Sequence, residues 1–146
     1  MYKHILIAFD GSELAEKAMR QALELAKTAG AKVTALYVWM PWSSIAVREI
    51  AVMFPPEEYE ANAIKASNAQ LQRVTDTARS LGVPCETKTA SEAQPYKSIV
   101  DAATADGCDL IVMGSHGRRG LSGLLLGSVT NKTLSHAHVP VLVYRE

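Results

Sequence analysis

The residues whose types and spacing could bind an anion lie between positions 114 and 128. Two residues separate Gly114 from Gly117, and nine more separate Gly117 from the pair Gly127-Ser128. Glycines let backbone N–H groups converge on an anion, and the N–H groups at the start of a helix favour phosphate. Ser128 could cap that helix or donate its hydroxyl to a phosphate oxygen. The spacing favours phosphate binding over the alternative, a glycine-rich turn followed by an ordinary helix.

Charged and polar residues accompany this segment. Arg118 and Arg119 add positive charge to the loop, and His116 lies within it. A single histidine without an orienting partner is more often an ordinary loop residue than a base. The commoner nucleotide motifs are missing, because the sequence has neither GxxxxGK[ST] nor GxGxxG after its first apolar run. A P-loop lysine and a dinucleotide fingerprint are therefore not expected.

Short apolar runs, rich in Ile, Val and Leu, predict the strands that must position these loops. Several are apolar at consecutive positions, which is typical of parallel strands covered on both faces. The predicted strands are Ile5–Phe9, Val33–Val38, Pro84–Thr89, Leu110–Met113 and Val139–Tyr144.

Four helices are predicted between the strands, each bounded by a recognisable start or stop signal. The first follows the N-cap Ser12 and stops at Gly30, and the second starts after Pro55-Pro56 and ends at Gly82. The buried face of the second helix is predicted to comprise Ile64, Leu71, Val74, Ala78 and Leu81. The third runs from Pro95 to about Asp106, with Ile99, Val100 and Ala103 on its buried face, and the fourth runs from about Gly127-Ser128 to His136.

The alternation of strands and helices predicts one α/β domain over residues 1–146, with no internal repeat. We expect a five-stranded parallel sheet in the order 3-2-1-4-5, a Rossmann-type fold with helices on both faces. Ligands of such sheets bind where the strand order reverses, here between the first and fourth strands. The apolar stretch from Trp39 to Phe54 could be a lid or a partner surface, but a loop packed on its own domain is the default.

Composition limits the classes of function. Lys plus Arg and Asp plus Glu each number 15, so the chain lacks the electrostatic footprint of a nucleic-acid or membrane-surface binder. The start of the chain has no secretory pattern, and no apolar run is long enough to span a membrane. Cys85 and Cys108 fit no zinc spacing and are expected to be unpaired thiols in a reducing compartment. The expected location is cytoplasmic.

The segment from Gly114 to Ser128 resembles the G-2x-G-9x-G-[ST] motif of the ATP-binding branch of the universal stress proteins. The similarity extends over the whole chain and is weakest between Met40 and Glu60. It includes the opening run from His4 to Ser12, the run from Asp109 to Gly114 and the final run from Val139 to Val143. The resemblance implies a stress-response or signalling module that binds ATP non-covalently.

Carried over by position, the resemblance implies an adenine pocket followed by a ribose and phosphate site. The adenine pocket would comprise Ala8, Phe9, Asp10, Val38 and Met113. The ribose and phosphates would contact Gly114, Gly117, Arg118, Gly127, Ser128 and Val129, with Ser115 and His116 between the glycines. At position 8 this chain has alanine where many members have proline or valine. Mg²⁺ or Mn²⁺ would bind mainly through phosphate oxygens, because few acidic residues lie near the motif.

Two other classes of function stay open. An enzyme of the same fold could hydrolyse ATP slowly, phosphorylate itself or transfer adenylyl groups, although neither HxGH nor an SGGxDS loop is present. A dimeric interaction module could bind AMP or a cyclic nucleotide instead. We also predict a homodimer through Val139–Tyr144, because an apolar strand at a sheet edge invites pairing with its own copy, and the resemblance implies an antiparallel arrangement. Catalytic residues and the protein partner cannot be named from the sequence.

Overall fold

The computed structural model describes residues 1–45, 54–117 and 125–145. They form a single-domain α/β fold whose five parallel strands follow the order β3-β2-β1-β4-β5, which confirms the predicted fold class. The strands are β1 (His4–Ala8), β2 (Lys32–Trp39), β3 (Cys85–Ser91), β4 (Leu110–Gly114) and β5 (Val141–Tyr144). The helices are α1 (Glu13–Ala29), α2 (Trp42–Ile45), α3 (Pro56–Leu81), α4 (Pro95–Ala105) and α5 (Ser128–His136).

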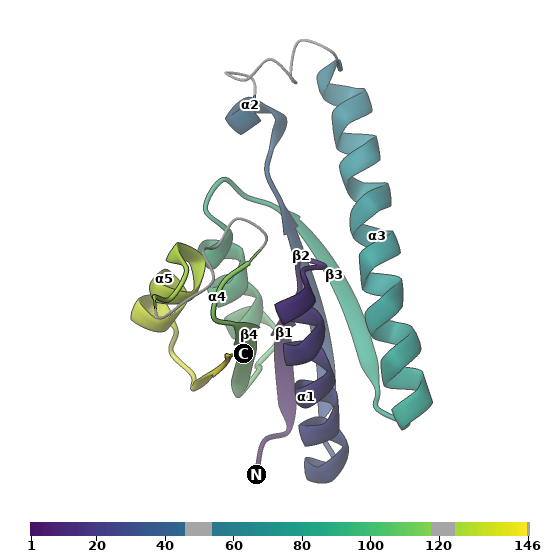
Figure 1. Cartoon of the computed structure of the whole chain (residues 1–146), viewed down its shortest axis with the longest axis vertical. Helices are drawn as coiled ribbons and strands as arrows, with labels where there is room; N and C mark the ends of the chain where they lie inside the picture. Colours follow the sequence, from purple (N-terminus) through teal and green to yellow (C-terminus); the bar gives the residue numbers. More distant parts are fainter. Residues whose placement is uncertain (46–53, 118–124, 146) are drawn as a thin grey trace.

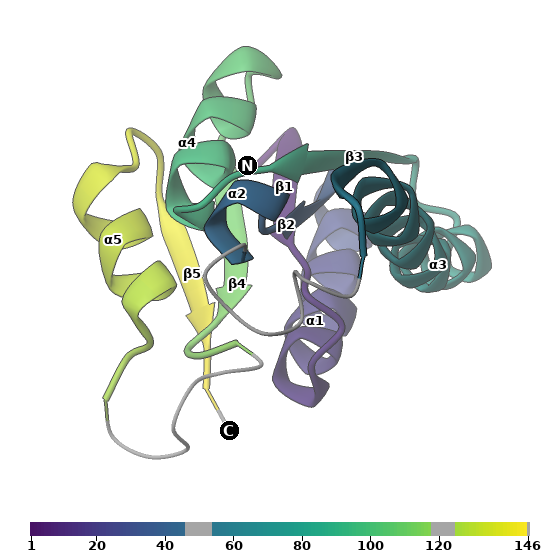
Figure 2. The ribbon, with the colours of Figure 1, turned by 90° about the horizontal axis from the view of Figure 1, so that it is seen from above.

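Helices cover both faces of the sheet, as predicted. Figures 1 and 2 show α1 and α3 on one face and α4 and α5 on the other. The α1/α3 side buries the larger apolar core, which includes Ile5, Ile7 and Met19. The α4/α5 side buries a smaller core around Leu6, Ile99 and Ile111. Alternate residues of the central strand β1 therefore belong to different cores, as the two-residue period of a strand requires.

The predicted signals bound the two long helices. The Ser12 hydroxyl accepts a hydrogen bond from the Ala15 N–H at 3.2 Å, and two glutamates occupy the first turn of α1. Gly30 and Gly82 end α1 and α3 in the left-handed conformation, with φ of 66° and 72°. These caps confirm the predicted helix boundaries.

Several predicted details of the edge strands and of α3 are wrong. The final strand begins at Val141 rather than Val139, and β3 is exposed along much of its length. These strands lie at opposite edges of the sheet, so each has a neighbouring strand on one side only. Ile64, predicted to be buried, has 44% of its surface exposed.

The stretch predicted as a loop after β2 contains a short helix, α2. Its described residues pack against α3: the rings of Trp39 and Tyr59 meet edge to face at 6.2 Å, and the Tyr59 hydroxyl donates to the Met40 carbonyl at 2.7 Å. The Trp42 indole donates to the Phe54 carbonyl at 3.2 Å. These contacts support a loop packed on its own domain at both ends, while its middle, residues 46–53, lies outside the described residues.

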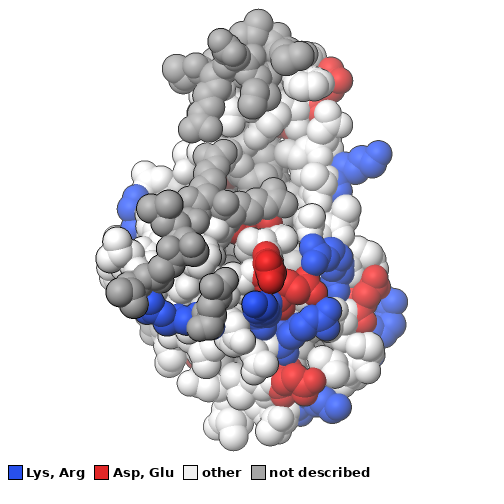
Figure 3. All heavy atoms as spheres, in the orientation of Figure 1, with Lys and Arg blue, Asp and Glu red and all other residues white. Residues whose placement is uncertain are grey.

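Charges of both signs mingle on the face shown in Figure 3, over α1 and α3. Glu16 binds both Arg20, at 2.9 Å, and Arg73 of α3, at 2.5 Å. Both cysteines are free thiols, and burial is the main cause that raises the pKa of each to about 11. Among the described residues, no helix is long and apolar enough to cross a membrane.

Candidate functional site

A cavity of about 530 Å³ opens at the carboxyl ends of β1, β2 and β4. The strand order of the sheet reverses between β1 and β4, at the same place. The volume of the cavity lies within the range of small-molecule sites. The sequence predicts a ligand at this place, and the structure provides a concave site there. The strands hold its floor rigidly, because β1 pairs with both β2 and β4.

Apolar side chains line the part of the cavity that lies over the sheet. Ala8, Val38 and Met113 come from three adjacent strands, and Ile99 joins them from α4. All four belong to or pack against the smaller core. Phe9 also lines the cavity, but its ring is 2% exposed and lies in the α1/α3 core, with the Arg73 guanidinium 5.8 Å from the ring centroid. This wall suits a flat, largely apolar ring.

Asp10 places a carboxylate at the rim of the cavity, immediately after β1. Its Oδ1 accepts the Ser12 N–H at 2.9 Å, an Asx turn that leads into α1, and Gly11 between them has φ of 80°. Its Oδ2 faces the loop after β4, because a Cβ built on Gly117 would lie only 2.5 Å from that oxygen. The loops that follow β1 and β4 therefore meet at Asp10 and Gly117.

The first turn of α5 also lines the cavity, through Ser128, Val129 and Thr130. Gly127 is the N-cap, so it supplies no side chain to accept the first N–H groups of the helix. Ser128 is the first helical residue, is exposed and makes no capping hydrogen bond, which rules out the predicted capping role. The buried Thr130 hydroxyl donates to the Gly114 carbonyl at 2.9 Å and fixes the start of α5 to the end of β4.

The glycines of the motif pack against protein atoms. A Cβ on Gly114 would lie 3.2 Å from Leu14 Cγ, and one on Gly127 would lie 3.2 Å from His116 Cα. The Gly127 N–H also donates to the Ser115 carbonyl at 2.7 Å. A Cβ at each position would thus contact the protein, so the glycines are needed first for the close approach of chain segments.

The structure brings most of the residues predicted for the site together. Those that line the cavity are Ala8, Phe9, Asp10, Val38, Met113, Gly114, His116, Gly117, Gly127, Ser128 and Val129. Ser115 is not among them, because it is buried behind the loop, where its N–H donates to the Tyr144 carbonyl at 2.8 Å. Arg118 and Arg119 lie outside the described residues.

Sequence reasoning missed the residues that approach the cavity from α2, α3 and α4. Trp39, Met40 and Ile45 were treated as part of an apolar loop, yet they line the cavity together with Tyr59 and Pro95. Two features of the sequence relate these residues to the cavity. The apolar stretch follows a strand that ends at the site, and Pro95 begins the helix after β3. Neither feature reveals that α3 and α4 reach the same cavity.

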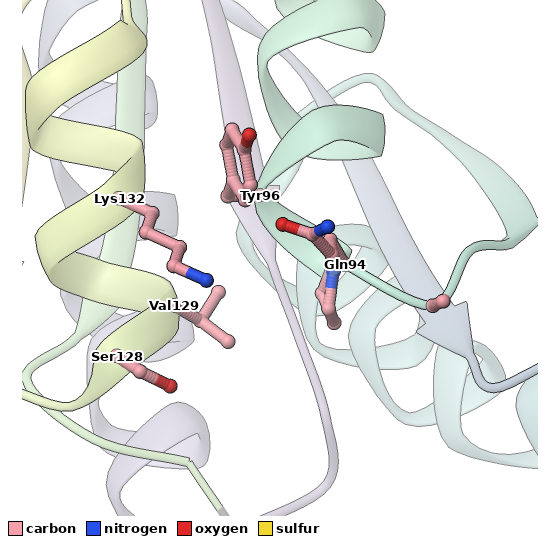
Figure 4. A pocket seen from close by; sticks show the side chains of 7 residues that line it. Gln94, Tyr96, Ser128, Val129 and Lys132 are labelled. Atoms are coloured by element: carbon pink, nitrogen blue, oxygen red, sulfur yellow. The ribbon is translucent and has the colours of Figure 1, made fainter. Parts of the chain in front are cut away.

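A smaller cavity of about 120 Å³ adjoins the first, between the starts of α4 and α5 (Figure 4). The two cavities share Pro95, Ser128 and Val129 in their walls. Lys132, one helical turn beyond Ser128, lines the smaller cavity, and its Nζ lies 5.7 Å from the centroid of the Tyr96 ring. Gln94 faces it from the N-cap of α4.

Two polar side chains, those of Ser115 and His116, meet in the loop that follows β4. Ser115 Oγ lies 3.3 Å from His116 Nδ1, but the hydroxyl belongs to a side chain that does not line the cavity. Across residues 1–45, 54–117 and 125–145, no three His, Cys, Asp or Glu side chains are grouped to hold a metal ion. Asp10 is the one acidic side chain in the described cavity wall, so a bound cation would need further ligands from phosphates or water.

Comparison with known proteins places the chain in a family. The model of the universal stress protein family matches residues 1–145. Universal stress protein MJ0531 of Methanocaldococcus jannaschii is 35% identical over 100% of this chain and 84% of its own length. A universal stress protein of Thermus aquaticus is 32% identical over 99% of this chain and 100% of its own. The solved structure of MJ0577 of M. jannaschii superimposes with a TM-score of 0.85 at 28% identity, over 100% of this chain and 97% of that one. The chain belongs to the universal stress protein family.

Proposed function

We propose that this protein binds ATP non-covalently in the larger cavity and acts as a stress-response or signalling module that reports nucleotide state. The observation that carries the proposal is the cavity itself, which has an apolar wall on one side and the uncapped start of α5 on the other. A nucleotide has the same division, with an apolar base at one end and phosphates at the other. The cavity is large enough for such a ligand.

Each part of the cavity matches one part of ATP. Ala8, Val38 and Met113 would contact the adenine ring, and the Asp10 carboxylate would accept hydrogen bonds from the adenine or the ribose. The first N–H groups of α5 and the Ser128 hydroxyl would donate to phosphate oxygens, where the helix dipole also favours negative charge. Mg²⁺ or Mn²⁺ would neutralise the phosphates, coordinated mainly by phosphate oxygens and water.

AMP and cyclic nucleotides are the competing ligands. A universal stress protein solved with cAMP superimposes with a TM-score of 0.72 at 24% identity, and one from Archaeoglobus fulgidus solved with dAMP superimposes at 0.67 and 23%. These likenesses concern the fold, so the choice of ligand has to be argued from this chain. The exposed start of α5 at the cavity favours a ligand with phosphates to place there.

Calorimetric titration of the purified protein with ATP, in the presence of Mg²⁺ or Mn²⁺, tests the proposal. We expect binding near one ATP per chain, and adenine absorbance in the supernatant when the protein is denatured. Ser128→Ala should weaken ATP binding about three- to tenfold without changing the stability of the unliganded protein, because its hydroxyl caps nothing. No heat with either metal, together with no released adenine, would contradict the proposal.

The same sample tests the enzymatic alternative. An ATPase, a self-kinase or an adenylyl transferase would need an activated nucleophile or a positioned base at the cavity. His116 is the described histidine that lines it. If His116→Ala abolished a measurable release of phosphate or transfer of label from ATP, the protein would be an enzyme rather than a binding module.

A further inference from the structure

A lysine of the smaller cavity lies beside the proposed phosphate site. Among the described residues that line the two cavities, Lys132 is the one lysine or arginine. The larger cavity contributes the Asp10 carboxylate and no lysine or arginine from its described wall. A triphosphate placed there would need positive charge from close by, and the adjoining cavity provides it.

Lys132 is positioned to act on the same ligand as Ser128. The two residues are four positions apart on α5 and therefore lie on one face of the helix. In Figure 4 the side chains of both extend from α5 into the space that Gln94 and Tyr96 border from α4. Because Ser128 and Val129 line both cavities, a phosphate chain that passes Ser128 would enter the smaller cavity, which Lys132 lines.

The surroundings of Lys132 leave its ammonium group able to accept an anion. Its Nζ lies over the Tyr96 ring, 5.7 Å from the centroid, and the centroids of the Tyr96 and His136 rings are 4.7 Å apart. The Glu92 carboxylate accepts the Gln94 N–H through Oε1 at 3.2 Å, and Glu92 does not line the cavity. The volume of the smaller cavity is about 120 Å³, which is several times the roughly 30 Å³ that a water molecule occupies in the liquid.

We propose that the smaller cavity is a subsite for the distal phosphates of the nucleotide, and that Lys132 makes the protein prefer a nucleoside triphosphate to a monophosphate. The inference rests on the proposed nucleotide binding and adds its specificity. Gln94 would contribute its amide N–H groups to the same phosphates. AMP would fill the larger cavity and leave the subsite to water.

Titrations of the full chain with MgATP and with AMP at low ionic strength test the subsite. The parent protein should bind ATP more tightly than AMP. Lys132→Gln should weaken ATP binding about three- to tenfold, the modest range that a charged hydrogen bond from an exposed lysine allows, and leave AMP binding nearly unchanged. Lys132→Arg should keep the preference. Lys97→Gln is the matched control, because it removes an equal charge from α4 at an exposed residue that lines neither cavity.

The outcomes separate this inference from the proposed function. If the parent binds ATP, but Lys132→Gln weakens ATP and AMP equally or weakens neither, the subsite is wrong and the nucleotide site stands. If Lys97→Gln has the same effect as Lys132→Gln, long-range charge rather than contact sets the preference, which also overturns the subsite. If the parent binds neither nucleotide, the proposed function fails and the subsite fails with it. Thermal melting of the unliganded variants shows whether each is folded.

Discussion

Gly117 and Gly127 both lack a side chain, but the atoms around the two positions differ in how far they can move. A Cβ at Gly117 would meet the end of the Asp10 side chain, whereas a Cβ at Gly127 would meet the backbone of Ser115 and His116. A carboxylate can rotate away, and a packed backbone cannot do so without distorting the loop. The two glycines of one motif should therefore respond differently to the same substitution.

We expect Gly117→Ala to impair binding and Gly127→Ala to impair stability. Displacement of the Asp10 carboxylate should weaken ATP binding about tenfold while hardly changing the unfolding of the unliganded protein. Crowding of the backbone at Gly127 should lower the free energy of unfolding by about 1–2 kcal/mol. Urea unfolding of the unliganded variants, paired with ATP titrations, measures both. Equal losses of stability would show that the two positions serve the same purpose.

Neither of these glycines has a positive φ, so close approach rather than backbone conformation explains them. Gly11 is different, because its φ of 80° lets the chain turn from β1 into α1 directly after Asp10. The spacing of the motif predicts which residues gather at the site. It does not show which neighbour excludes a side chain at each glycine, since Asp10 is more than 100 positions from Gly117 in the sequence.

At the scale of elements, α3 shows where the pattern of apolar residues stops predicting burial. Its spacing correctly predicts that Leu71, Val74 and Ala78 are buried. The helix has 26 residues and is about 39 Å long, whereas β2 and β3, with 8 and 7 residues, span no more than about 27 Å. The difference of about 12 Å leaves roughly the first third of α3 beyond the ends of the strands (Figure 1), and the first buried residue of the helix is Ser67.

The limits of sequence periodicity also explain why some residues of the cavities are not predicted. Strand ends and glycine spacing predict the residues that follow β1 and β4, because the topology forces them to one edge. Tyr59 and Ile99 reach the cavity only through the packing angles of α3 and α4, which local periodicity does not contain. Lys132 was likewise not predicted, since nothing in the sequence relates it to Gln94.

The edge strand β5 carries the prediction of a homodimer. The Pro140 and Tyr144 carbonyls accept hydrogen bonds from the Ile111 and Ser115 N–H groups of β4. Because strand hydrogen bonding alternates, the backbone groups of Val141 and Val143 point to the open edge. Leu142 lies between them and is 40% exposed. At the opposite edge, β3 presents Glu86 and Lys88, which protect an edge from pairing.

Val143→Pro should give a monomer that remains folded. Proline removes the N–H that faces the open edge and spares the bonds to β4, so it blocks pairing with a second copy while keeping the sheet. Light scattering should show a dimeric mass for the parent and a monomeric mass for the variant at micromolar concentration. Thr87→Pro, at the other edge, serves as the control for proline itself and should leave the dimer intact. A monomeric parent protein would contradict the predicted dimer.

At the scale of the whole molecule, Asp109 joins the two central strands at the end of the sheet opposite the cavity. Its Oδ2 accepts the Lys3 N–H at 2.8 Å and its Oδ1 accepts the His4 N–H at 3.1 Å. Desolvation raises the pKa of this carboxyl, but these backbone N–H groups outweigh it, so the pKa lies below the ordinary 3.8. The ionised form is therefore favoured by folding.

Asp109→Asn should destabilise the protein at neutral pH and matter less in acid. A carboxyl whose pKa is lowered by folding stabilises the folded state above its ordinary pKa, and that contribution is lost as the pH falls through the folded value. We expect a loss of about 1 kcal/mol at pH 7, since the group is partly exposed, with the difference between the two proteins narrowing below about pH 4. Urea unfolding at pH 7 and pH 3 measures it. A difference that grew in acid would contradict this role.

The central place of β1 has a consequence for the order in which the chain can fold during synthesis. β1 is made before the other four strands of its sheet, and one of its two neighbours, β4, begins only at Leu110. Until then the buried residues Ile5 to Ile7 have an open edge and one incomplete face. A nascent chain that ends before Leu110 should therefore aggregate or need a chaperone, and folding can be completed only when β4 and β5 have left the ribosome.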